Sequence, residues 1–151
     1  MVRFCFIFLA VSALISLNAA DPEHMRTIAK GAFSGIRAPL NTVVTNEIQW
    51  TEVWGKHSVN EKQVEAAPTI DFNKESVILA AMGEKRTGGY AIEVFAVEDS
   101  AASYVVRVRT KAPKPGGFQL QALSAPFHIV AVPKISKPVH FKLEATEGND
   151  R

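Results

Sequence analysis

Cysteine is almost absent from this sequence. The one cysteine among 151 residues, Cys5, lies in an apolar stretch, residues 4–17, that follows Arg3 and leads to Ala19 and Ala20. A basic residue, a short apolar core and small residues at its end are typical of a secretory signal peptide, and the core is short for a membrane span. We therefore expect residues 1–20 to be a signal peptide cleaved after Ala19 or Ala20, with a retained anchor helix as the alternative.

The lack of cysteine bears on how the exported protein would be stabilised. Removing residues 1–20 leaves no thiol, although a periplasmic or secreted location in a bacterium would permit disulfide bonds. We therefore expect core packing alone to hold the fold, and no membrane span after signal cleavage.

An excess of one charge is also lacking. The chain has 17 lysines and arginines against 15 aspartates and glutamates. Proteins that bind nucleic acid carry a concentrated basic surface. The sequence therefore predicts no nucleic-acid partner.

Recognisable catalytic and metal-binding motifs are missing as well. The four histidines are not spaced with another His, Asp or Glu as in a zinc or hydrolase motif, and no serine lies in a Gly-x-Ser-x-Gly turn. The glycine pairs lack the following helix that would bind a phosphate. We predict a protein that is not an enzyme and has no cofactor or metal, although a pair of glycosidase-like carboxylates stays open. His128, in an apolar stretch, is expected to be a hydrogen-bonded core histidine.

The chain that remains has the length of one domain and is rich in strand patterns. The fold class we predict is α+β: a mainly antiparallel sheet of five to seven strands packed on one helix in the N-terminal half. Residues 21–45 form an N-terminal segment with a short strand, 46–144 the main domain, and 145–151 a flexible tail. The expected strands are residues 27–35, 77–82, 90–97, 104–111, 127–132 and 139–144, with 118–123 as a possible edge strand.

One helix is predicted, beginning at Asn46. Asn46 can cap it, with Gln49 three residues later, and Gly55 can end it. Trp50 and Trp54 fall on one face, which we expect to form the helix side of the core. An aromatic groove for a peptide or a sugar is the less favoured interpretation.

Residues 77–94 are the most distinctive stretch. The apolar run at residues 77–82 predicts a strand covered on both faces, and Gly83 marks a bend or a close approach of backbone. Gly88 and Gly89 between Thr87 and Tyr90 predict a tight hairpin turn. The alternative is that the glycine pair lets a partner approach the backbone, with Tyr90 as its anchor.

Two features follow the strand that begins at Tyr90. Residues 104–111 alternate between apolar and basic side chains, so that Arg107 and Arg109 share a wet face on which Glu93 can lie near Arg109. A solvated strand face is favoured there over a patch for an acidic partner. The prolines and glycines of residues 112–117 predict an extended loop.

Several of these positions together resemble the PrcB C-terminal domain family, which is named for a subunit of a bacterial surface protease complex. The similarity runs from about residue 46 to 141. The positions that carry it are Phe72, Val77-Ile78, Met82-Gly83, Thr87-Gly88-Gly89-Tyr90, Ile92, Pro113-x-Pro115-Gly116 and Ala125-Pro126-x-x-Ile129-Val130, with the tryptophan-bearing helix.

The resemblance implies a non-catalytic, secreted or periplasmic module that supports a protein partner, such as a secreted or envelope protease or its assembly. The candidate partner-binding residues are those of the two glycine turns: Thr87, Gly88, Gly89, Tyr90, Pro115 and Gly116. Two alternatives stay open. The Thr-Gly-Gly-Tyr turn echoes chagasin-type protease inhibitors, although their Arg-Pro-Trp element is missing, and the chain could be an envelope protein without a protease link.

Overall fold

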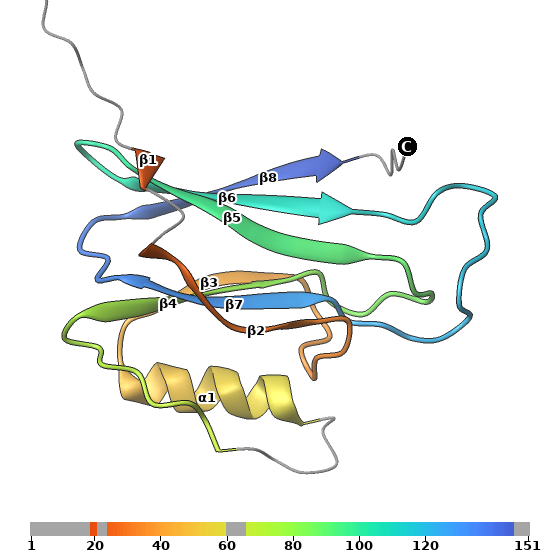
Figure 1. Ribbon diagram of the computed structural model, residues 1–151. Helices are drawn as coiled ribbons and strands as arrows, with labels where there is room; N and C mark the ends of the chain where they lie inside the picture. The colour runs from red at the N-terminus through yellow and green to blue at the C-terminus, as the bar shows by residue number, and fades with distance from the viewer. Residues whose placement is uncertain (1–18, 21–23, 60–65, 147–151) are drawn as a thin grey trace, which may run out of the picture.

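The protein is described by a computed structural model in which residues 19–20, 24–59 and 66–146 are placed. The described chain forms three layers: a sheet, a second sheet and one helix that covers the outer face of the second sheet (Figure 1). The predicted α+β class with mainly antiparallel sheet is confirmed. The signal peptide predicted at residues 1–20 falls almost entirely outside the described residues.

Among the described residues, each sheet has four strands. Sheet A has the order β1-β5-β6-β8, and sheet B, on which the helix packs, has the order β2-β7-β4-β3. Their bounds are β1 Ala19–Ala20, β2 Arg26–Gly31, β3 Leu40–Val44, β4 Glu75–Ala81, β5 Ala91–Asp99, β6 Tyr104–Lys111, β7 Phe127–Pro133 and β8 Val139–Thr146.

The apolar runs of β4 and β7 are explained by their central place in sheet B. Side chains alternate across a strand, so a strand between two covered faces is apolar at every position. Val77, Leu79 and Ile129 point toward the helix, and Ile78 and Val130 toward sheet A. All five are fully buried.

The helix α1, Glu47–Ser58, begins as predicted. The Asn46 carboxamide accepts a hydrogen bond from Gln49 N at 3.0 Å, and the Gln49 side chain accepts one from Thr45 N at 3.0 Å. Trp50 is fully buried and Trp54 nearly so. The Trp50 indole N–H donates to the Pro68 carbonyl at 2.8 Å, so the polar edge of the ring is satisfied within the core.

The predicted end of the helix at Gly55 is wrong, because α1 continues to Ser58. Ser58 Oγ donates to the Trp54 carbonyl at 2.7 Å, and Gly35 N donates to the His57 carbonyl at 2.7 Å. The His57 carbonyl is one of the last four of the helix, which have no partner within it, so the bond from Gly35 satisfies it. The last turn is therefore held by side-chain and tertiary hydrogen bonds.

Other corrections concern strand pairing. The predicted hairpin around Gly88 and Gly89 does not form, because β4 belongs to sheet B and β5 to sheet A. Residues 118–123 are not a strand, and β3 is a second strand in the N-terminal segment, where only one short strand was predicted. The predicted tail starts too early, since β8 runs to Thr146, and β8 pairs with β6 in parallel.

Candidate functional site

Both of the connections that follow β4 and β6 cross between the sheets at the same end of the sandwich, on the right in Figure 1. The first, residues 82–90, joins β4 to β5, and the second, residues 112–126, joins β6 to β7. Lys85 and Ser124 exchange two backbone hydrogen bonds, of 2.7 and 2.9 Å. This pairing makes the two connections one surface, which we call the loop end.

The first connection leaves sheet B at Gly83. This residue has a φ of 70°, and an added Cβ would lie 2.7 Å from the Arg37 carbonyl oxygen. Glu84 N donates to the same oxygen at 2.8 Å. The close approach predicted at Gly83 is therefore confirmed: only glycine fits both the backbone angle and the space.

The Thr-Gly-Gly-Tyr turn lies against the second connection. The Thr87 carbonyl accepts from Ser124 Oγ at 2.8 Å, and Gly88 N donates to the Leu120 carbonyl at 2.9 Å. Gly89 has a φ of 87°, and a Cβ there would lie 2.9 Å from Pro113. The glycine pair thus admits backbone contact with the chain's own second loop.

Tyr90, the last residue of the Thr-Gly-Gly-Tyr turn, is half-buried. Lys85 Nζ lies 5.6 Å from the centre of the Tyr90 ring. Such a cation–π contact orients the ring at the surface of the loop end.

The second connection opens with a turn that projects freely. Gly117 N donates to the Lys114 carbonyl at 3.2 Å, and Gly116 has a φ of 74°. Proline followed by a glycine of positive φ is the pattern of a type II turn. Pro115 and Gly116 are exposed, and nothing lies within 4 Å of a Cβ built on Gly116. The structure therefore brings all six predicted residues to one end, with the first turn packed and the second free.

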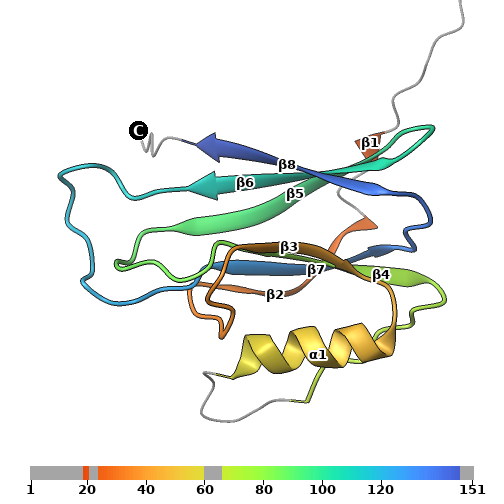
Figure 2. The same ribbon diagram turned by 180° about the vertical axis from the view of Figure 1, so that it is seen from behind.

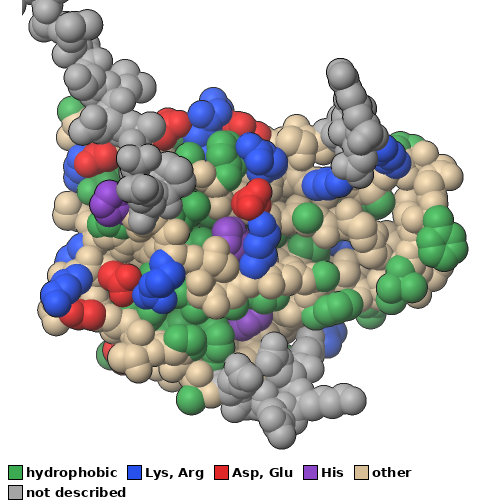
Figure 3. All heavy atoms as spheres, in the orientation of Figure 1, with side chains coloured by type: hydrophobic (Ala, Val, Ile, Leu, Met, Phe, Trp, Pro, Cys, Tyr) green, Lys and Arg blue, Asp and Glu red, His purple; other side chains and the backbone are tan. Residues whose placement is uncertain are grey.

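Three exposed apolar side chains follow this turn and are not among the six residues predicted from the sequence. Phe118 is fully exposed, and Leu120 and Leu123 are each about 60% exposed. Figure 3 shows hydrophobic side chains over this end of the molecule. We call Phe118, Leu120 and Leu123 the apolar tip. The alternation of residues 118–123, which suggested an edge strand, is the sequence pattern that could have identified them. Because these residues join no sheet, the three side chains face solvent.

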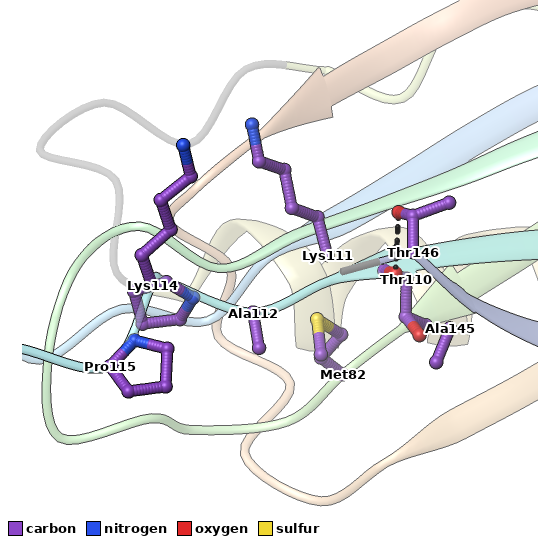
Figure 4. A pocket seen from close by; sticks show the side chains of 9 residues that line it. Met82, Thr110, Lys111, Ala112, Lys114, Pro115, Ala145 and Thr146 are labelled. Carbon is purple, nitrogen blue, oxygen red and sulfur yellow. Dashed lines mark hydrogen bonds between the residues drawn. The ribbon is translucent and has the colours of Figure 1, made fainter. Parts of the chain in front are cut away.

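A hollow of about 480 Å³ lies between the second connection and the ends of β6 and β8. Met82, Ala112, Pro113, Pro115 and Ala145 give it an apolar lining (Figure 4). Thr146 Oγ1 donates to the Thr110 carbonyl at 3.0 Å on one side, and the side chains of Lys111 and Lys114 extend in the same direction on the other. The hollow thus combines apolar walls with two cationic groups.

The basic face predicted on β6 is balanced by carboxylates. Arg107 is bound by Glu144 at 2.5 Å and by Glu98 at 3.1 Å, and these contacts raise the pKa of Arg107. Arg109 Nη1 lies 3.8 Å from Glu93, and its guanidinium lies 4.3 Å from the centre of the Phe95 ring. The arrangement supports a solvated strand face.

His128 is a buried, hydrogen-bonded residue, as predicted. Its Nδ1 accepts from Val94 N at 3.0 Å, and its Nε2 lies 3.0 Å from Thr27 Oγ1. Burial and then the positive charge of Lys30 lower the pKa of His128 to about 4, against the smaller opposite effect of Glu93. Because β7 is in sheet B and β5 in sheet A, this neutral imidazole bridges the two sheets.

The described residues contain neither a cluster of metal ligands nor a membrane-spanning helix. Among residues 19–20, 24–59 and 66–146, no three His, Cys, Asp or Glu side chains gather as a metal site requires. Within the same part of the chain no helix has the length and apolarity needed to cross a membrane.

The comparisons with known proteins concern the centre of the fold. No curated protein and no solved structure matches the chain. The family model described as PrcB C-terminal matches residues 76–133, a narrower span than the resemblance at residues 46–141, because α1 and β8 lie outside it. The part of the chain that forms β4 to β7 and both connections of the loop end is therefore similar to the PrcB C-terminal family.

Proposed function

We propose that this protein is an exported, non-catalytic binding module that docks onto a secreted or envelope protease assembly through its loop end. The PrcB C-terminal match supports the link to a protease complex. The apolar N-terminal segment, residues 4–17, supports export to the periplasm or the medium. The role of the fold in this proposal is to present a surface, and no residue is assigned to bond-making.

The observation that carries the proposal is the apolar tip. Phe118 is fully exposed and lies four residues from Lys114, whose carbonyl accepts hydrogen bonds from Gly117 N and Gln119 Nε2. The loop is thus ordered by its own bonds while its aromatic ring is in water. A partner that buries an aromatic ring on such a loop has less backbone to order on binding, and aromatic residues are enriched among the contacts that dominate protein–protein affinity.

The test is affinity capture with Phe118→Ser. The tagged protein is incubated with the periplasmic and secreted fractions of its source cells, and protease activity in the eluate is measured on gelatin. We expect the unmodified protein to capture protease activity and Phe118→Ser to lose most of it, because truncating a central aromatic contact typically costs about 2 kcal/mol or more, at least about tenfold in affinity.

Ile48→Ser provides a matched control. Ile48 is 84% exposed, on α1 beneath sheet B and outside the loop end, so this variant removes similar apolar surface elsewhere. It should capture protease activity as well as the unmodified protein does. Equal capture by Phe118→Ser, or no protease activity with any form, would rule out the proposal.

Export is tested separately by the N-terminus of the mature chain. We expect mass spectrometry of the periplasmic or secreted protein to find a chain that starts at Ala20 or Asp21. A chain that keeps Met1 and stays with the cytoplasmic fraction would contradict this part of the proposal.

A further inference from the structure

The strand β8 forms one border of sheet A, and neither view of the fold shows a described strand beyond it (Figures 1 and 2). Tyr104 N donates to the Pro138 carbonyl at 2.8 Å, with Tyr104 opposite Val139 in a parallel ladder. In such a ladder successive residues of β8 turn their backbone groups alternately toward β6 and away from it. The groups of Val139, Phe141, Leu143 and Ala145 therefore face outward, and an unpaired row of this kind is a template for another strand.

The side chains of β8 are complementary to a second copy of the same strand. If two copies pair antiparallel with Leu143 opposite Leu143, then Lys142 of each copy lies opposite Glu144 of the other. Opposite charges facing each other across a strand pair stabilise it. Leu143 is 56% exposed in the single chain, and this pairing would bring the two leucines together at the centre of the contact.

Other registers lack this match. Pairing centred on Lys142 places two lysines opposite each other, which is unfavourable. Pairing centred on Phe141 places His140 opposite Lys142 and leaves Glu144 beyond the opposing strand. The register centred on Leu143 is therefore the one that the charges favour.

From this edge we infer that the protein self-associates as a symmetric dimer through antiparallel β8–β8 pairing about Leu143, which joins two copies of sheet A into one continuous sheet. A two-fold contact uses the same surface on both copies, as this one does. One strand edge buries less area than a standard protein–protein interface, so the dimer should be weak and reversible. The inference does not depend on the proposed protease partner, because the contact lies outside the loop end.

The test is sedimentation velocity of the mature protein over a concentration series, with charge-swapped variants. The unmodified chain should shift from monomer to dimer as its concentration rises. Lys142→Glu and Glu144→Lys each place like charges opposite each other, so each should raise the dissociation constant at least about tenfold. An equimolar mixture of the two variants should associate again, because the two acidic side chains of one variant then lie opposite the two lysines of the other.

Two further variants control for folding and for charge. Glu144 binds Arg107, so Glu144→Lys is first checked by thermal unfolding; if it does not fold, Leu143→Lys serves, since it puts like charges on the two-fold axis without disturbing an ion pair. Lys74→Glu makes the same charge change as Lys142→Glu just before β4, in sheet B, and should leave association unchanged.

The inference is overturned by any of three results. The first is a chain that stays monomeric at every concentration, including one that binds only a different protein through β8. The second is a Lys142→Glu or Leu143→Lys variant that associates as well as the unmodified chain. The third is a mixture of folded Lys142→Glu and Glu144→Lys that stays monomeric.

Discussion

Two glycines of positive φ separate the energetic cost of a backbone angle from that of a steric clash. At Gly83 (φ 70°) an added Cβ would meet Arg37, Ala38 and Pro39 at 2.7 to 2.8 Å, whereas at Gly116 (φ 74°) it would meet nothing within 4 Å. All of the atoms at Gly83 are backbone atoms, which cannot rotate away as a side chain would.

Gly83→Ala should therefore destabilise the protein much more than Gly116→Ala. We expect a loss of about 1–2 kcal/mol at Gly116, from the backbone angle alone, and roughly 3–5 kcal/mol at Gly83, where the clash is added. Urea unfolding followed by tryptophan fluorescence measures both. Equal losses in the two variants would mean that the connection at Gly83 relaxes freely.

The helix contains a glycine that the fold does not need. Gly55 lies in the interior of α1, and nothing lies within 4 Å of a Cβ built there. Gly55→Ala should raise the free energy of unfolding by about 0.5–1 kcal/mol, because alanine loses less backbone entropy on folding. Thermal unfolding by circular dichroism checks this, and a lower midpoint than that of the unmodified protein would argue against an α1 that runs through Gly55 to Ser58.

The start of α1 is determined by its local sequence, and its end by a residue distant in the chain. Asn46, Gln49, Trp50 and Trp54 act over one or two turns, so their spacing alone predicts the start of the helix and its buried face. The last turn depends on Gly35, which is distant in the chain and donates to the His57 carbonyl. The predicted end was wrong because no local pattern reports that bond.

At the scale of the whole molecule, His128 joins the two sheets through a hydrogen bond that protonation of its ring would remove. Nδ1 of His128 accepts from Val94 N only when the ring is neutral, and Glu93 beside it forms an ion pair with Lys30 at 2.7 Å. The hydrogen bond from Lys30 lowers the pKa of Glu93 as well. Both groups therefore favour the folded state above the acid range.

The free energy of unfolding should decrease as the pH is lowered through a range set by His128. Its pKa is about 4 in the folded protein and 6.5 ordinarily, so between these values the unfolded chain binds the proton more readily. The contribution of the neutral ring is complete above pH 6.5 and is lost progressively as the pH falls to 4, by at most about 3 kcal/mol.

Urea unfolding at intervals from about pH 7 to pH 4 measures this loss. His128→Gln is the control, because its amide can accept from Val94 N and donate to Thr27 without titrating. Between pH 6.5 and 4 the variant should lose less free energy of unfolding than the unmodified protein, by about the amount assigned to His128. Equal losses in the two proteins would show that His128 does not set the pH range.

The local sequence was enough to predict the α+β class, the strands from β4 to β8, the helix start with its tryptophan face, and a core histidine. Each of these predictions depends on a local pattern: a period of two residues for a strand, a spacing of three to four for the helix face, or a turn or capping residue within the segment. The same local patterns selected Thr87 to Tyr90 and Pro115-Gly116, which the structure places at one end of the molecule.

Long-range pairing was needed for the rest. Thr87-Gly88-Gly89-Tyr90 has the composition of a hairpin turn, yet β4 finds its partners in β3 and β7, and β5 finds its own in β1 and β6. Strand composition reports whether each face is covered and not which strand lies alongside, because backbone hydrogen bonds are the same for every residue. The sharing of strands between two sheets, the exposure of Phe118 and the open edge at β8 all follow from that pairing, which involves residues far apart in the chain.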